Sequence, residues 1–209
     1  MVHSKKKIIL ISPTSDDFRK PLAEGQSGFF FPPMGLMLVA QTLKNSGYDV
    51  DVFDGNFDPD YKDKILKNTK ENSADIVFIG FYLAFLQIKD FVDLLKTIKL
   101  QWPKITTLVG GPFPAVFPEM TSKYNLIDIV CWGDGAQVSV QLADSIRDGK
   151  EWSEIPNLCF KKNGQIQKNS KSISDSLHKD NHIHLEEFLD LEKYVHKFDV
   201  YLGRDKNPQ

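Results

Sequence analysis

Two adjacent glycines, Gly110 and Gly111, are the first residues of this chain to suggest a binding site. They lie in the stretch VGGPFPAVFPE, residues 109–119, directly after an apolar run that is typical of a buried strand. Glycines at the carboxyl end of a strand let the backbone turn sharply and leave no Cβ between the main chain and a ligand. An isolated pair of glycines usually makes a tight turn and nothing more, so the rest of the sequence must show whether this pair has a binding role.

Histidine chemistry has few places in this sequence. No histidine lies between His3 and His178, so a Ser, Cys or Thr nucleophile in that part of the chain has no histidine to activate it. His178, His182 and His184 have spacings that a metal could use. Together with Asp180 they lie in a polar stretch without a scaffold to hold ligand geometry, so we expect them to be solvated and predict no metal site.

Phosphate-binding motifs also fit poorly. A dinucleotide fingerprint needs its glycines after the first strand, where this chain has SPTSDDF, and there is no GxxxxGK[ST] loop. Asp16 and Asp17 follow the first strand, as acidic residues do in phosphoacceptor domains. That function also needs an acidic residue after the third strand, where Phe81, Tyr82 and Leu83 stand. The loops are instead apolar, aromatic and rich in glycine, which suits a large, partly apolar ligand.

Composition narrows the class of protein further. The net charge of -2 over 209 residues gives no electrostatic case for binding nucleic acid or an anionic membrane. No apolar run approaches the ~20 residues that span a bilayer, and the N-terminus lacks the apolar core of a signal peptide, so we expect a cytoplasmic protein. The two cysteines, Cys131 and Cys159, are too few for a disulfide framework or for an iron–sulfur cluster held by three or four cysteines of this chain.

Strands and helices are expected to alternate along the first 150 residues, which predicts βαβ crossovers and a parallel sheet with helices on both faces. We predict an α/β, doubly wound, flavodoxin-like fold with a five-stranded parallel sheet in the order 2-1-3-4-5. All the loops that follow the strands then lie along one edge of the sheet, which favours a binding role for the glycine pair. The strands are expected at residues 7–12, 48–53, 75–82, 106–109 and 127–132, with helices beginning near Pro33, Pro59, Ile88, Pro114 and Gly135.

The last part of the chain differs in character. Residues 157–161 and 165–168 flank Asn163-Gly164, a dipeptide that strongly favours a two-residue β-hairpin turn. Residues 168–179 are polar and rich in Ser and Lys, as in a flexible linker, and residues 185–198 carry apolar side chains at helical intervals. We therefore divide the chain into a sheet domain, residues 1–150, and a hairpin, linker and helical tail, residues 151–209.

Five motifs follow one another along nearly the whole chain: PPMGLMLVAQTLKNSGYDVDVFD (residues 32–54), DIVFIGF (75–81), VGGPFPAVFPE (109–119), IDIVCWGDGA (127–136) and IPNLCFKKNGQI (155–166). In content and order they closely resemble the N-terminal cobalamin (B12)-binding domain of cobalamin-dependent radical SAM enzymes. The later DLEKY, residues 190–194, resembles the linker that such proteins carry before their catalytic barrel.

The resemblance implies that a corrin lies face-on against the carboxyl edge of the sheet, with its nucleotide tail running between strands. Because the chain lacks the DxHxxG motif, the cobalt is expected to have no protein histidine ligand. GDGA at residues 133–136 stands where the family commonly has GEGE, and Phe-Tyr-Leu replaces a polar residue after the third strand. The residues expected around the cofactor are Ser12, Pro13, Thr14, Pro32, Pro33, Met34, Phe81, Tyr82, Leu83, Gly110, Gly111, Pro112, Gly133, Asp134 and Gly135.

The leading hypothesis is a cobalamin-binding module that serves a radical SAM domain, in cis or in trans, for methyl transfer or related carbon chemistry. The chain has no CxxxCxxC motif, so S-adenosylmethionine and a [4Fe-4S] cluster are expected only in a longer parent chain, and no catalytic residue is predicted here. A second hypothesis is a structural or interaction domain in which Phe81 and Tyr82 fill the corrin site. A flavin- or nucleotide-binding enzyme of the same fold is a third.

Overall fold

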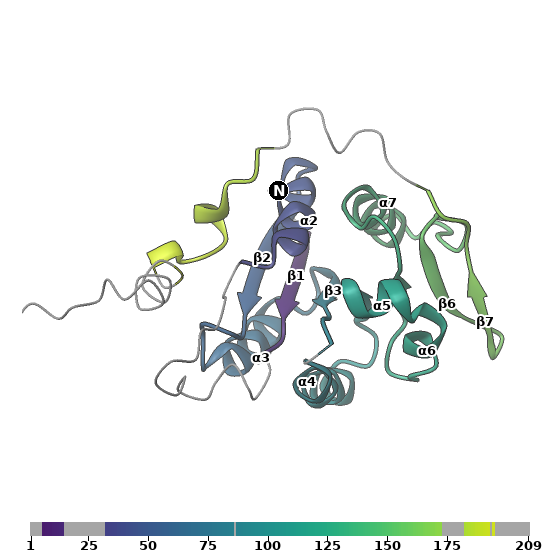
Figure 1. The fold of residues 1–209 in the computed structure, drawn as a ribbon, viewed down its shortest axis with the longest axis horizontal. Helices are drawn as coiled ribbons and strands as arrows, with labels where there is room; N and C mark the ends of the chain where they lie inside the picture. The colour runs from purple at the N-terminus through teal and green to yellow at the C-terminus, as the bar shows by residue number, and fades with distance from the viewer. Residues whose placement is uncertain (1–5, 15–31, 86, 173–181, 193, 195–209) are drawn as a thin grey trace, which may run out of the picture.

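A single mixed β-sheet runs through the computed structural model, which describes residues 6–14, 32–85, 87–172, 182–192 and 194 (Figure 1). In these residues the strand order is β2-β1-β3-β4-β5-β6-β7, and β1 to β5 are parallel. The predicted order 2-1-3-4-5 is therefore confirmed. The strands are β1 (Lys7–Ser12), β2 (Asp49–Asp54), β3 (Ile76–Tyr82), β4 (Thr106–Gly110), β5 (Ile129–Cys131), β6 (Leu158–Lys162) and β7 (Gln165–Lys168).

Helices cover both faces of the parallel strands, which is why strands such as β1 and β3 are apolar along nearly their whole length. Two apolar clusters result. One joins α2 and α7 to one face of the sheet, and the other joins α3 and α4 to the opposite face. The helices are α2 (Met34–Asn45), α3 (Tyr61–Asn72), α4 (Ile88–Gln101), α5 (Pro112–Val116), α6 (Pro118–Ser122) and α7 (Ala136–Arg147).

The helix expected near Pro114 is two short helices, α5 and α6, that meet at Phe117. Pro118 explains the break, because proline disfavours a helical conformation in the residue before it. Phe117 accordingly has φ -124° and ψ 55°, outside the helical region.

The predicted hairpin forms, and it extends the same sheet instead of standing apart from it. Asn163 (φ 54°) and Gly164 (φ 79°) make the left-handed turn that this dipeptide favours. Strand β6 pairs antiparallel with β5, and β7 with β6, so the sheet has seven strands in the described residues where five were expected. The hairpin covers the edge that β5 would otherwise expose.

Beyond the hairpin the structure describes residues 182–192 and Tyr194, which include the 3₁₀ helix η2 (Leu185–Glu187). This segment lies beside β2, at the opposite edge of the sheet from β6 and β7 (Figure 1). Most of the expected linker and the end of the expected tail helix, residues 173–181 and 195–198, lie outside the described residues. None of the helices in the described part of the chain is long and apolar enough to cross a membrane.

Candidate functional site

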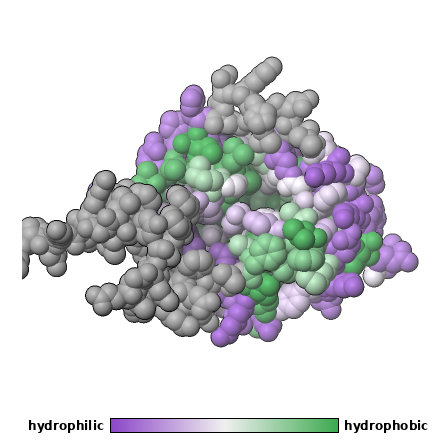
Figure 2. Space-filling model, viewed as in Figure 1, coloured by the Kyte–Doolittle hydropathy of each residue, from purple (hydrophilic) through white to green (hydrophobic). Residues whose placement is uncertain are grey.

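A cavity of about 160 Å³ opens at the carboxyl ends of β3, β4 and β5, between α2 and α7. Figure 2 shows a hollow at this place, with hydrophobic side chains on both sides of it. Six of its lining residues are glycines, so bare backbone makes up much of its wall. The lining consists of Gly35, Gly80, Gly110, Gly111, Gly133 and Gly135, with Leu10, Leu36, Val39, Phe81, Tyr82, Leu108, Cys131 and Ser139.

The two central glycines have different roles. A Cβ added to Gly110 would lie 3.7 Å from the carbonyl oxygen of Cys131, an ordinary contact, so Gly110 leaves free space in the cavity wall. Gly111 has φ 105° and ψ -174°, and an added Cβ would lie 2.9 Å from both the backbone nitrogen and the oxygen of Leu83. Only glycine fits that backbone conformation without strain. Gly111 is therefore required by the turn of the backbone, whereas Gly110 leaves room in the cavity.

The turn at Gly111 is held by the loop after β3. The backbone nitrogen of Leu83 donates to the oxygen of Gly110 at 2.8 Å, and that of Phe113 donates to the oxygen of Leu83 at 3.1 Å. These bonds bring the ends of β3 and β4 together at the cavity mouth. Pro112 begins α5 and is exposed, and it does not line the cavity.

Gly133 and Gly135 line the other side of the cavity, whereas Asp134 between them is not part of the lining. Gly135 leaves space, because an added Cβ would meet Val39 at 3.5 Å, whereas at Gly133 it would meet the Asn157 side chain at 2.6 Å. The Oδ1 atom of Asp134 accepts a hydrogen bond from the backbone nitrogen of Ala136 at 3.2 Å, at the start of α7. Its Oδ2 atom is buried and has no hydrogen-bond partner among the residues that the structure describes.

Tyr82 alone of the residues 81–83 directs its ring to the cavity side of the sheet. It packs on the cluster between α2 and α7, and its ring would be 3.6 Å from a Cβ on Gly35. The ring of Phe81 packs edge-on against Phe91, with centroids 5.1 Å apart, in the cluster on the opposite face, which also contains Leu83. The hypothesis of a structural domain required the Phe81 side chain to fill the cavity, and the structure places that side chain on the opposite face of the sheet instead. Burial raises the pKa of Tyr82, so its hydroxyl stays neutral.

The residues predicted at the ends of β1 and at the start of α2 lie outside the cavity lining. Ser12, Pro13 and Thr14 are buried at the end of β1, where the Thr14 backbone nitrogen donates to Asp90 at 3.2 Å. Pro33 is buried and its oxygen accepts from the first turn of α2, while Pro32 is partly buried. Met34 is 47% exposed.

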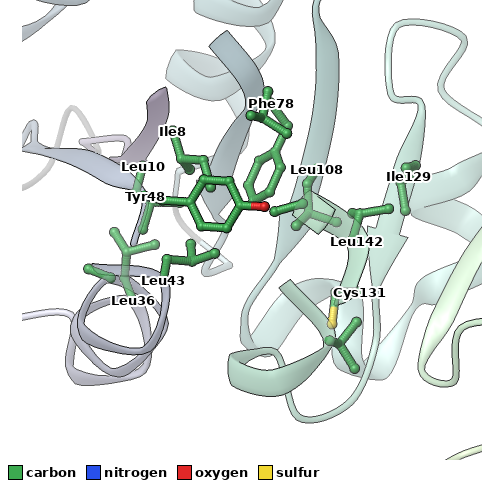
Figure 3. Close-up of a cluster of buried hydrophobic side chains, with 14 of the residues drawn as sticks. Ile8, Leu10, Leu36, Leu43, Tyr48, Phe78, Leu108, Ile129, Cys131 and Leu142 are labelled. Atoms are coloured by element: carbon green, nitrogen blue, oxygen red, sulfur yellow. The ribbon is translucent and has the colours of Figure 1, made fainter. Parts of the chain in front are cut away.

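Sequence reasoning missed several lining residues. Gly35 lies inside a helix and Gly80 inside a strand, where glycine is intrinsically unfavourable. Their positions could therefore have identified them as candidate site residues. Leu36 and Leu10 belong to the apolar cluster that continues beneath the cavity (Figure 3). Cys131 also lines the cavity, and its burial raises the pKa of the thiol to about 11, so it is a neutral, apolar wall residue at physiological pH.

The described residues contain no group of three His, Cys, Asp or Glu side chains able to hold a metal ion. His182 and His184 are described, and both are exposed at the far edge of the sheet, whereas His178 and Asp180 lie outside the described residues. The lining is therefore mostly apolar, with backbone and a few polar atoms, which suits a binding site without an acid–base pair.

The sequence model of the family described as B12 binding domain matches residues 24–143. Among curated proteins, the chain is 28% identical over 162 residues to an uncharacterized methyltransferase, PH0819, of Pyrococcus horikoshii. It is 20% identical over 161 residues to an anaerobic magnesium-protoporphyrin IX monomethyl ester cyclase of Synechocystis. The matches cover 77% of this chain in both cases, but 34% and 32% of the relatives, so the chain spans about a third of their length.

Solved structures share the fold. The radical S-adenosylmethionine methyltransferase TsrM from Kitasatospora setae, solved with cobalamin and a [4Fe-4S] cluster bound, matches with a TM-score of 0.65 and 17% identity. That match covers 86% of this chain and 31% of TsrM. The cobalamin-dependent radical enzyme OxsB, solved with aqua-cobalamin and S-adenosylmethionine, matches with a TM-score of 0.64 and 17% identity, over 82% of this chain and 23% of OxsB.

Proposed function

Because this chain belongs to the B12-binding domain family, we propose that it binds cobalamin at the carboxyl edge of its sheet, with the nucleotide tail in the glycine-lined cavity. The observation that carries this proposal is the space left by Gly35, Gly110 and Gly135. At each of these three positions a Cβ would fit without a clash, so the glycines are not required by packing of the protein itself. A cavity kept open in this way suits a ligand that needs close approach to backbone.

The chemistry of the site divides between polar and apolar parts. Leu10, Leu108 and Cys131 give the inner wall an apolar surface for a flat heterocycle, such as the base of the nucleotide tail. Ser139 on α7 and the ring of Tyr82 stand at the same cavity and supply hydroxyl groups for polar atoms of the ligand. When bound, cobalamin would supply a cobalt centre able to carry a methyl group or an electron, and this chain would hold and orient it.

We further propose that this module serves a radical SAM domain, in cis or in trans, in a methyltransferase or a related carbon-chemistry enzyme. The support is the similarity to PH0819, TsrM and OxsB together with the fact that the matches cover 34%, 31% and 23% of these proteins. This sequence has no CxxxCxxC motif, so in this proposal S-adenosylmethionine and the [4Fe-4S] cluster belong to that other domain. The division at residue 150 is part of this proposal, with the extension leading towards the radical SAM domain.

Electron paramagnetic resonance of the cob(II)alamin complex tests both the binding and the absence of a protein ligand. Free cob(II)alamin shows nitrogen superhyperfine splitting from its own base, and a protein histidine would show the same kind of splitting. In the proposed binding mode the tail lies in the cavity, which takes its base away from the cobalt. No histidine lies between residues 4 and 177 to replace it, so we expect the bound signal to lack nitrogen splitting. The variant His182→Ala/His184→Ala, which changes the two described histidines, should give the same spectrum as the wild type. A nitrogen splitting that persists would contradict the proposed binding mode.

A further inference from the structure

Residues 182–192 and 194 lie at the far edge of the sheet from the hairpin and contact α2 and β2 there (Figure 1). We call residues 182–192 and 194 the strap. Its backbone nitrogen at His184 donates to the Oε1 atom of Gln41 at 3.0 Å, and Glu187 pairs with Lys44 at 2.6 Å. The apolar side chains of the strap that pack on the cluster under α2 are Ile183, Leu185, Phe188 and Leu189.

The strap ends in a buried hydrogen bond. The hydroxyl of Tyr194 donates to the Oδ2 atom of Asp54 at 2.6 Å, and the two residues are 7% and 5% exposed. The Tyr194 ring also lies on Phe57, with ring centroids 3.8 Å apart. Hydrogen bonds to charged groups contribute more than neutral ones, and burial strengthens them further. Burial and the Asp54 charge raise the pKa of Tyr194, which keeps the donor proton in place.

The ion pair between the strap and α2 is weaker by comparison. Lys44 and Glu187 are 43% and 40% exposed, and a surface ion pair of that kind contributes little to stability. The Lys44 ammonium also stands 5.4 Å from the ring centroid of Phe188. The bond between Tyr194 and Asp54 is thus a buried, charge-assisted contact at the last described residue of the strap.

The contact between Tyr194 and Asp54 lies at the same edge of the sheet as the cavity. Asp54 is the last residue of β2 and pairs in register with Ser12 at the end of β1, so it lies at the carboxyl edge of the sheet. Strand β1 separates β2 from β3, whose end lines the cavity, and neighbouring strands are about 4.8 Å apart. The strap therefore ends at the same edge of the sheet as the cavity. Two strand spacings, roughly 10 Å, separate the end of β2, where Tyr194 binds, from the end of β3 at the cavity.

We propose that Tyr194 is a positioning residue, whose bond to Asp54 fixes the point at which the chain leaves the sheet, beside the cofactor cavity. A domain that follows the strap would then begin at the edge where the cofactor lies. The importance of this exit point rests on the proposed function, whereas the docking of the strap does not. The two can therefore fail separately.

The test uses the whole 209-residue chain without cofactor. Spin labels are placed at Glu192→Cys on the strap and Val116→Cys on α5, since both positions are exposed and both native cysteines are buried. We expect a narrow distance distribution in the otherwise unchanged chain and a broad one after Tyr194→Phe. Amide hydrogen exchange of residues 182–192 should become about tenfold faster in the same variant, because a buried hydrogen bond to a charged group is lost.

Tyr48→Phe is the matched control, since Tyr48 makes a tyrosine–carboxylate bond of the same length, 2.6 Å, to Asp144. It should reduce thermal stability less, because Asp144 is 47% exposed, and it should leave the label distances narrow and the strap protected. A broad distribution in the unchanged chain, or a narrow one in Tyr194→Phe, would overturn the proposal. Failure of the chain to bind cobalamin would leave this result unaffected.

Discussion

The variant Gly111→Ala is expected to destabilise the chain by about 3 kcal/mol, because its strain combines two causes. The backbone at Gly111, with φ 105° and ψ -174°, is a conformation that an alanine adopts at a cost of roughly 1–3 kcal/mol. The new Cβ would also lie 2.9 Å from the backbone of Leu83, which is itself held by its hydrogen bond to Gly110. Urea unfolding measures the change as a lower midpoint at an unchanged slope.

Gly110→Ala is the control, since it adds the same methyl group one residue earlier. Its Cβ would meet Cys131 at ordinary contact distances of 3.7 and 3.8 Å, and its backbone angle needs no glycine. We expect its unfolding midpoint to stay close to that of the wild type. Equal midpoints for the two alanine variants would show that the strain assigned to Gly111 is absent.

Gly110→Val is expected to weaken cobalamin binding at least about tenfold while leaving the fold stable. The valine side chain would extend into the cavity at the place where the tail is proposed to lie, and overpacking of a filled site costs about 1–3 kcal/mol. Valine is favourable in a strand, and Gly110 is the last residue of β4. Equilibrium dialysis with hydroxocobalamin gives the affinity, and urea unfolding shows whether the fold has changed.

Thr106→Val provides the matched control for this variant. It introduces a valine at the opposite, amino end of the same strand, away from the cavity lining. We expect its cobalamin affinity to equal that of the wild type. If Gly110→Val binds cobalamin as tightly as Thr106→Val does, the cavity beside Gly110 does not hold the ligand.

The parallel sheet was predictable because its strands are short apolar runs separated by helical patterns of ordinary length. The turn of the hairpin was equally clear from Asn163-Gly164. Its pairing partner was not, because the alternation of residues in β6 reports the faces of a strand and not the neighbour at its edge. The contact between Asp54 and Tyr194 joins residues 140 positions apart, and no local pattern predicts such a pair.

The site was predicted in part for the same physical reasons. Glycines after strands were recognised, since they mark turns at the carboxyl edge, and Gly110, Gly111 and Gly135 line the cavity. Which face of the sheet holds the cavity could not be read from the sequence. It depends on α2 and α7 leaving a space, and this decides that Tyr82 faces the cavity while Phe81 packs behind it.

The most direct test of the account compares hydroxocobalamin with cobinamide, which has the corrin but lacks the nucleotide tail. The purified chain is mixed with each compound and passed through a desalting column, and the visible absorbance of the protein fraction is recorded. Because the glycine-lined cavity is proposed to hold the tail, we predict that hydroxocobalamin is retained and that cobinamide binds at least about tenfold more weakly. Loss of all corrin absorbance would contradict the binding claim, and equal retention of both compounds would contradict the assignment of the cavity to the tail.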